Sequence, residues 1–457
     1  MSRRRKLQDH DCRYNALKKY VNFTTRISYR KIKYTGLERI PKDGAVILAP
    51  NHTGALMDAL VILAMDNKPK VFIARADIFR NPKLAAMFKF FKMMPIMRMR
   101  DGIEEVKKNN RTIEIAADVL KDRVPLCIFP EGTHQTKYSM LPLSKGIFRI
   151  ALQAKELLGD TPLYIVPVGI RYGNFYRFHS SLRVQVGNPI NVGEFIASHS
   201  DSTPQEQMNL MRKHLDERMK ENILYIPNDE EYDAKNEICT AVSRIQLKKH
   251  KEEGSEPLVE VNREAAKHIE QLKEHKPEEA KRLIALAEEA SKMRKQKQIS
   301  LTSVAKQPTM CSQILRFILL LATLPYTLAA MTLTLPITAV STLLTRKFKD
   351  RAFHNSVRYV LQLVLWPLLM IIYTIIAFSS LSPLWAICAT AAMLPAPAVT
   401  QETSRGLRLT VSDFKLWRCK ALLSKYNEIR NIFFNFNSIS YIITFPRQAR
   451  NTKRPLD

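Results

Sequence analysis

Short apolar runs alternate with stretches of helical spacing from residue 44 to about residue 190. The runs read GAVILAPNH, KVFIA, MPIMR, PLCIFP, PLYIVPVGIRY and LRVQVGNPI, and each has the length and composition of a strand. Helical spacing follows the N-cap pair Asn81-Pro82 and recurs over residues 103–120 and 145–158. This alternation predicts an α/β domain with a mostly parallel or mixed sheet over residues 36–230.

A charged segment with helical spacing follows, over residues 231–310. One helical face of this segment carries Val261, Ala265, Ile269 and Leu272. Pro277 then interrupts the pattern before a second helical stretch. We interpret the segment as a charged helical connector, with a dedicated partner site as the alternative.

Three long runs in the last third of the chain contain no charged residue, namely 317–345, 359–378 and 381–401. Each is long enough to cross or nearly cross a hydrocarbon layer of about 30 Å. A buried soluble core does not normally supply three such runs in so short a stretch. We therefore expect a transmembrane region over residues 311–403, with two to four membrane helices.

Lysine and arginine flank these runs at RKFKDR, residues 346–351, and in a basic C-terminal tail, residues 404–457. The positive-inside rule assigns both segments to the cytoplasmic side and the uncharged turn 379–383 to the opposite side. The first run then bends back near Pro325 or Pro336, or it crosses once as a long tilted helix. We expect an integral membrane protein whose α/β domain lies on the cytoplasmic side.

The formal charge of +28 favours anionic partners, either nucleic acid or an acidic membrane leaflet. No groove-reading motif or aromatic stacking platform accompanies the charge, so we expect anionic lipids as partners and no nucleic acid. Residues 1–35 form a basic amphipathic segment without the continuous apolar stretch of a cleaved signal. The six cysteines lack CxxC spacing, so neither a zinc cluster nor a disulfide framework is expected.

The first candidate for chemistry is APNHTGALMDAL, where His52 follows a strand and Asp58 falls in the first turns of the next helix. An imidazole is the usual group that removes a proton from an alcohol near neutral pH. A carboxylate on its second nitrogen would fix the tautomer and stabilise the imidazolium. A separation of six does not place both residues on one helical face, so the chain must fold back between them. A structural histidine is the alternative.

Arginines end the strand in MPIMRMRDG, where Arg98 and Arg100 are two residues apart. Because side chains in a strand alternate, both guanidinium groups point to the same side, where they could bind phosphate oxygens. A solvated basic pair is the alternative.

In FPEGTHQTK, a buried strand delivers Glu131, Gly132 and Thr133 into a turn. Glu131 could accept a hydrogen bond from a substrate hydroxyl or hold one of the arginines, and Gly132 allows close approach of the backbone. Lys137 and Lys145 follow within reach of the same mouth. A plain turn is the alternative here, while IVPVGIRYG is interpreted as a core strand with a packing role.

The order and text of NHTGALMD, MPIMRMRD, FPEGT and IVPVG resemble the glycerolipid acyltransferase family over residues 36–195. The resemblance implies a mixed sheet flanked by helices, with His52 and Asp58 as the catalytic pair. It also implies that Arg98 or Arg100, with Glu131, Gly132 and Thr133, holds a phosphorylated glycerol acceptor. The family includes acyltransferases for glycerol-3-phosphate and for its monoacylated product.

Two departures from the family pattern are visible. Five residues separate His52 from Asp58 where four are common, which is similar to one branch of the family. His134 and Gln135 follow FPEGT where a basic residue and serine are usual, so Lys137 or Lys145 would replace that charge.

The expected reaction is transfer of an acyl group from acyl-CoA or acyl-carrier protein to the acceptor hydroxyl, with no metal or other cofactor. No GxSxG motif indicates a covalent acyl-enzyme. Backbone N–H groups at the helix start after His52 are candidates for the oxyanion site. An acceptor that is another lysolipid, or a non-catalytic membrane scaffold, are the alternatives.

Overall fold

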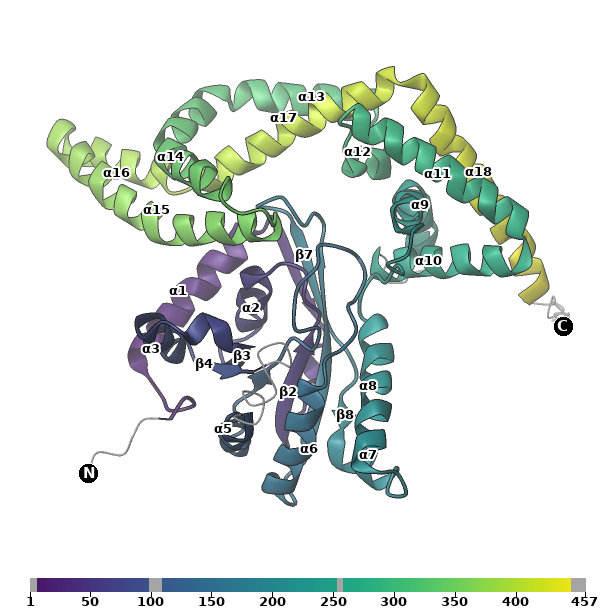
Figure 1. Cartoon of the computed structure of the whole chain (residues 1–457). Helices are drawn as coiled ribbons and strands as arrows, with labels where there is room; N and C mark the ends of the chain where they lie inside the picture. The colour runs from purple at the N-terminus through teal and green to yellow at the C-terminus, as the bar shows by residue number, and fades with distance from the viewer. Residues whose placement is uncertain (1–5, 98–108, 253–257, 445–457) are drawn as a thin grey trace, which may run out of the picture. The chain divides into compact units, whose positions relative to one another are not determined.

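The computed structural model describes residues 6–97, 109–252 and 258–444 (Figure 1). The chain divides into two compact units, which consist of residues 1–224 with 324–403 and of residues 225–323 with 404–457. The first unit contains the sheet, and its elements before the membrane helices are α1 (Cys12–Ser28), β1 (Lys31–Thr35), β2 (Ala45–Pro50), α2 (Leu56–Leu63), β3 (Val71–Arg75), α3 (Pro82–Phe90), β4 (Met93–Ile96), α5 (Asn109–Lys121), β5 (Leu126–Cys127), α6 (Gly146–Leu158), β6 (Leu163–Tyr172), β7 (Ser181–Val186), β8 (Ile190–Asn191), α7 (Val192–Ala197) and α8 (Pro204–Lys220).

The sheet is mixed, and its strand order is β1-β7-β6-β2-β5-β3-β4, with β8 paired to β6. Strands β2, β5 and β6 run parallel as neighbours, whereas β7 and β8 run antiparallel to β6. The α1 and α2 helices lie on one face, and α5, α6 and α8 cover the other (Figure 1). The mixed sheet flanked by helices that the family resemblance implied is therefore confirmed.

Local sequence signals explain where several helices begin. The Asn81 side chain accepts hydrogen bonds from the N–H groups of Lys83 and Leu84, with Pro82 at the first helical position of α3. The α6 helix spans Gly146–Leu158, as its spacing predicted. Strand β1 was not predicted: it pairs in parallel with β7, although it lies in the segment that we interpreted as a basic amphipathic N-terminus.

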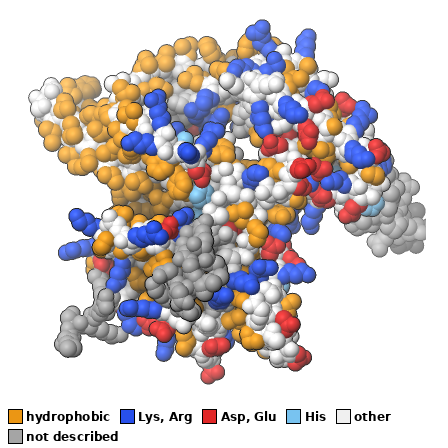
Figure 2. Space-filling model, in the orientation of Figure 1, with side chains coloured by type: hydrophobic (Ala, Val, Ile, Leu, Met, Phe, Trp, Pro, Cys, Tyr) orange, Lys and Arg blue, Asp and Glu red, His pale blue; other side chains and the backbone are white. Residues whose placement is uncertain are grey.

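Among the residues that the structure describes, two helices are long and apolar enough to cross a membrane, α14 (Leu324–Thr345) and α15 (Ala352–Ser380). The helices α16 (Pro383–Met393) and α17 (Ala396–Arg418) would form a third span only as one broken pair. The first uncharged run divides at Thr323, next to Pro325, because α13 (Met310–Ala322) ends there and α14 begins. Hydrophobic side chains cover the region of α14 to α16 in Figure 2.

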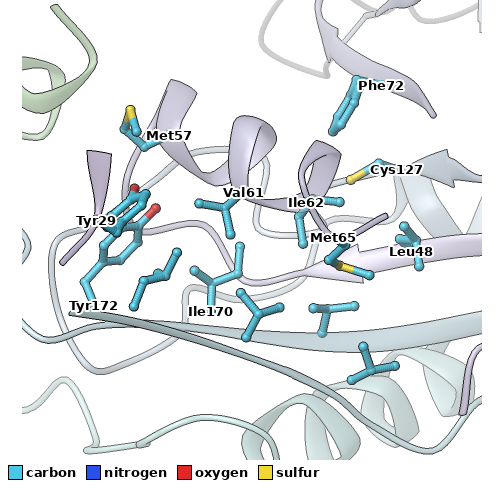
Figure 3. Close-up of a cluster of buried hydrophobic side chains, with 14 of the residues drawn as sticks. Tyr29, Leu48, Met57, Val61, Ile62, Met65, Phe72, Cys127, Ile170 and Tyr172 are labelled. Carbon is cyan, nitrogen blue, oxygen red and sulfur yellow. The ribbon is translucent and has the colours of Figure 1, made fainter. Parts of the chain in front are cut away.

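The core beside the sheet is built by α2 from above and by alternate residues of the strands from below (Figure 3). Its fully buried members from these elements include Leu48, Val61, Ile62, Val168, Ile170 and Val184. Tyr359 from α15 belongs to the same core, is 2% exposed, and shares hydrogen bonds with the hydroxyls of Thr24 and Thr25 in α1. The start of a membrane helix is thus anchored in the core of the α/β domain.

The second unit is helical and joins segments that are far apart in sequence. Its helices are α9 (Tyr232–Glu252), α10 (Leu258–His275), α11 (Pro277–Gln296), α12 (Leu301–Lys306), α13, most of α17, and α18 (Lys420–Thr444). The predicted apolar face of α10 is buried at Ala265, Ile269 and Leu272. The connector and the C-terminal tail therefore pack together as one unit.

Candidate active site

The candidate site lies at the carboxyl edge of three neighbouring parallel strands. His52 follows β2, Glu131 follows β5 and Tyr172 ends β6. Because these strands are parallel and adjacent, their ends meet at one edge of the sheet, where open α/β sheets commonly bind ligands. Asn51 extends the β2–β6 pairing, since its side chain both donates to the carbonyl of Ile170 and accepts from the N–H of Ile170.

His52 and Asp58 form a direct pair, with 2.8 Å between His52 Nδ1 and Asp58 Oδ2. The carboxylate can only accept, so Nδ1 carries the proton and Nε2 is the basic nitrogen. The Asp58 side chain is fully buried, whereas that of His52 is 18% exposed. The arrangement is therefore that of a histidine oriented by a carboxylate, with one nitrogen left for a substrate proton.

The loop between the two residues folds back as the spacing required. Ala55 takes φ 53° and ψ −125°, a conformation that is strained for a residue with a side chain. The N–H groups of Thr53 and Gly54 donate to Asp58 Oδ2 at 2.8 and 2.7 Å. These two N–H groups therefore orient Asp58.

Tyr172 completes the environment of Asp58, because its hydroxyl donates to Asp58 Oδ1 at 2.6 Å. Burial and the nearby Asp58 carboxylate raise the pKa of Tyr172 well above its usual value, so the hydroxyl keeps its proton. A methyl group on Gly54 would lie 2.6 Å from this hydroxyl oxygen and 2.8 Å from Asp58 Oδ1. Glycine is thus required at residue 54 for space.

The sequence analysis gave IVPVGIRYG only a packing role and missed Tyr172. A signal was present, because Tyr172 lies an even number of residues from the buried Val168 and Ile170 and so shares their face of β6. A hydroxyl on a buried face needs a partner. The identity of that partner depended on the register between β2 and β6.

Glu131 links two loops rather than facing solvent. Its Oε1 accepts from the N–H of His52 and its Oε2 accepts from the N–H of Leu141, both at 2.7 Å. Burial raises the pKa of Glu131 to about 7, although both N–H groups favour its charged form. These contacts hold the backbone of His52 in place.

The turn after Glu131 is fixed by its backbone. Gly132 takes φ +67°, which glycine adopts without steric cost, and its N–H donates to the carbonyl of Phe129. Thr133 is exposed at the surface of the turn. The N–H of Gln135 donates to the carbonyl of His52 at 3.1 Å, so this loop and the histidine loop are bound at two points.

Two aromatic side chains from FPEGTH enclose the His52 ring. Phe129 stacks on it with ring centroids 4.3 Å apart, and His134 meets it edge-on at 5.4 Å. His134 was noted in the sequence only as a departure from the family pattern. Its place beside His52 follows from the hydrogen bonds that join the two loops.

The predicted cations are only partly described. Lys137 is half-buried in the loop between β5 and α6, and Lys145 is exposed at the N-terminus of α6. Arg98 and Arg100 lie outside the described residues, after the end of β4. The strand β4 runs parallel to β3, and β3 to β5, so this strand ends at the same edge of the sheet as the candidate site.

The segment that carries this site is similar to known proteins. Residues 31–171 match the family model described as Acyltransferase. A 1-acyl-sn-glycerol-3-phosphate acyltransferase from Cocos nucifera is 32% identical over 161 residues, which are 35% of this chain and 47% of the relative. Glycerol-3-phosphate O-acyltransferase 2 from Saccharomyces cerevisiae is 29% identical over 23% of this chain and 14% of the relative.

A solved structure is also similar, the 1-acyl-sn-glycerophosphate acyltransferase PlsC from Thermotoga maritima. It is 19% identical, with 46% of this chain and 78% of that chain covered and a TM-score of 0.32. The chain spans less than half the length of each of the two curated relatives. The segment that carries His52, Asp58 and Glu131 thus matches the Acyltransferase family model and is similar to glycerolipid acyltransferases.

Proposed function

We propose that this chain transfers a fatty acyl group from acyl-CoA or acyl-carrier protein to the hydroxyl of glycerol-3-phosphate or 1-acylglycerol-3-phosphate. The observation that carries the proposal is the His52–Asp58 pair, with its basic Nε2 at the ligand-binding edge of the sheet. The relatives named above include acyltransferases of both acceptor types.

In the proposed reaction, His52 Nε2 removes the proton of the acceptor hydroxyl as its oxygen attacks the thioester carbonyl. The carbon–sulfur bond then breaks, and the leaving thiolate takes the proton from His52. Asp58 stabilises the imidazolium between these steps, while Tyr172, Thr53 and Gly54 hold Asp58 in place. Transfer thus proceeds without a covalent acyl-enzyme, and no other cofactor takes part.

Two buried groups next to His52 are suited to stabilise the oxyanion. Thr53 Oγ1 and Gln135 Nε2 have no hydrogen-bond partner within the part of the chain that the structure describes. Thr53 follows His52 in sequence, and the backbone of Gln135 binds that of His52. Unsatisfied buried donors are rare in proteins, and a developing oxyanion would satisfy them.

The acceptor phosphate is assigned to Arg98 and Arg100, with Gly132 and Thr133 in the turn and Lys137 and Lys145 as additional cations. A guanidinium binds two phosphate oxygens at once. We place the acyltransferase domain on the cytoplasmic side, with α14 and α15 in the bilayer and the basic segments against anionic lipids.

The test is transfer of a radiolabelled acyl group by the purified full chain in liposomes, with each acceptor supplied in turn. His52→Ala should lower kcat by about 10²- to 10⁴-fold, the usual contribution of general-base catalysis. The exposed His275 in α10 provides a control, since His275→Ala removes an imidazole far along the chain. Activity of His52→Ala within tenfold of wild type would rule out the general-base role, and wild type without any transfer would favour a scaffold.

A further inference from the structure

The two candidate membrane helices are joined by the short basic loop 346–351, which we call the hairpin loop. The outward faces of α14 and α15 are apolar, and their exposed side chains include Leu328, Leu335, Leu343, Val364, Leu368, Ile371, Ile372 and Ile375. Figure 2 shows hydrophobic side chains gathered over this region. Such a surface needs a cover, and a bilayer provides it. The hairpin loop then lies at the surface of that bilayer.

The hairpin loop contacts the active site through His134. Asp350 Oδ2 accepts a hydrogen bond from His134 Nε2 at 2.9 Å, and the ring of Phe353, in the first turn of α15, meets the His134 ring edge-on at 5.1 Å. His134 in turn contacts the ring of His52. One imidazole therefore separates the membrane hairpin from the proposed general base.

The Asp350 carboxylate has two separate roles. Its Oδ1 accepts from the N–H of Ala352 at the start of α15, while Oδ2 binds His134. Burial raises the pKa of Asp350, but these two hydrogen bonds, together with the electrostatic effect of His134 and His354, lower the pKa overall, so the group stays charged. Asp350 is the one acidic residue of the hairpin loop, whose cations are Arg346, Lys347, Lys349 and Arg351.

A second site loop is bound by the same hairpin. Asn355 donates to the carbonyl of Phe175 at 2.7 Å, and the Arg351 guanidinium lies over the Tyr176 ring at 4.6 Å. The Tyr176 hydroxyl shares a hydrogen bond with that of Thr136, which lies in the loop between β5 and α6. The hairpin thus fixes both loops that follow β5 and β6 at the catalytic edge.

We propose that the hairpin loop, through Asp350 and Phe353 on His134, forms the membrane-side rim of the acceptor site and receives a monoacylated glycerol phosphate directly from the bilayer. The inference rests on the proposed function and narrows its acceptor. The acyl chain of such an acceptor stays in the bilayer, and the loop cations attract its phosphate to the surface. His134, Asp350 and Phe353 are positioning residues here, and His52 remains the base.

The test compares two acceptors with the same head group, a long-chain 1-acylglycerol-3-phosphate in liposomes and a short-chain one dissolved in water. Asp350→Ser keeps an oxygen for the N–H of Ala352 but is too short for His134. Because Asp350 is half exposed, the loss of its hydrogen bond with His134 should raise KM for the long-chain acceptor about two- to fivefold. The double variant Asp350→Ser with Phe353→Ala removes both contacts with His134 and should raise KM for the long-chain acceptor about tenfold.

Under the proposal, kcat, KM for the acyl donor and KM for the short-chain acceptor change less than twofold. The exposed carboxylate of Asp160, just after α6, gives the matched control, and Asp160→Ser should leave KM for both acceptors within twofold. An unchanged KM for the long-chain acceptor, or an equal rise for both acceptors, would overturn the inference. Wild type that acylates neither acceptor would refute the proposed function instead.

Discussion

The catalytic edge of the sheet and the membrane hairpin are both rich in apolar residues, yet they bury them against different surroundings. Around Asp58 every contact is internal, and four donors converge on a fully buried carboxylate. Along α15 the large side chains point outward, for example Ile375, which is 64% exposed. The edge is therefore intolerant of small changes in volume, whereas the outward hairpin face tolerates large ones.

The two regions nevertheless share structure where they meet. Tyr359 lies in the sheet-side core, and its hydroxyl is bound by Thr24 and Thr25. Tyr20 of α1 also donates to the carbonyl of Leu363 in α15. The hairpin is thus part of the folded catalytic domain at one end and a membrane element at the other.

Among the variants that compare these two regions, the largest effect should come from one added methyl group at the catalytic edge. Gly54→Ala places a carbon 2.6 Å from the Tyr172 hydroxyl and 2.8 Å from Asp58 Oδ1, so one of them must move. Misplacement of about 1 Å in a catalytic group costs roughly 10²-fold, and we expect such a fall in kcat. Radiolabelled acyl transfer in liposomes measures it.

The matched change on the hairpin alters the side-chain volume more and should lower kcat less. Ile375→Ala removes three carbons from an exposed position and should leave kcat within twofold, because no packed core surrounds this side chain. If Gly54→Ala keeps kcat within threefold, or if Ile375→Ala loses as much activity, the contrast between the two regions is wrong.

Features carried by local pattern were predictable from the sequence. Helical spacing and Asn81-Pro82 predicted α3, and the apolar runs predicted six of the strands. The strand β1 was not predicted, because KIKYT is equally typical of a basic amphipathic segment. Only its pairing with β7 makes it part of the sheet. The length of the uncharged runs predicted membrane helices. Where one helix ends and the next begins depended on backbone breaks such as Thr323.

From the sequence we predicted that His52 and Asp58 form a pair, and in the structure His52 Nδ1 lies 2.8 Å from Asp58 Oδ2. It could not predict that Glu131 would bind backbone N–H groups, because that depends on how the 131–141 loop crosses the histidine loop. Nor could it predict the contact of Tyr172 with Asp58 across 114 residues. The register between paired strands decides such contacts, and this register cannot be derived from a single sequence.

A smaller effect is expected from Tyr172→Phe, which removes one hydroxyl and no volume from the catalytic edge. The lost hydrogen bond to a charged group is worth about 1.5–3 kcal/mol. Because Asp58 keeps three other donors, we expect kcat to fall about tenfold with KM for both substrates little changed.

Tyr164 supplies the control on the same strand, since its hydroxyl donates to Asp43 away from the catalytic edge. Tyr164→Phe should leave kcat within twofold. Equal losses in the two variants would show that Tyr172 acts through general stability and not through Asp58.

The smallest effect concerns the pH dependence of stability. Burial raises the pKa of Glu131 from 4.5 to about 7. Between these values the folded chain holds a proton that the unfolded chain has released, so the free energy of unfolding falls as the pH rises. One proton contributes at most about 1.4 kcal/mol per pH unit. Glu131→Gln removes this titration and should flatten the decline between pH 5 and about 7, as measured by thermal unfolding in detergent.

Glu38→Gln, at an exposed carboxyl, should retain the wild-type slope. A slope for Glu131→Gln equal to that of wild type would mean that the buried carboxylate is charged throughout this range, with its two N–H partners outweighing burial.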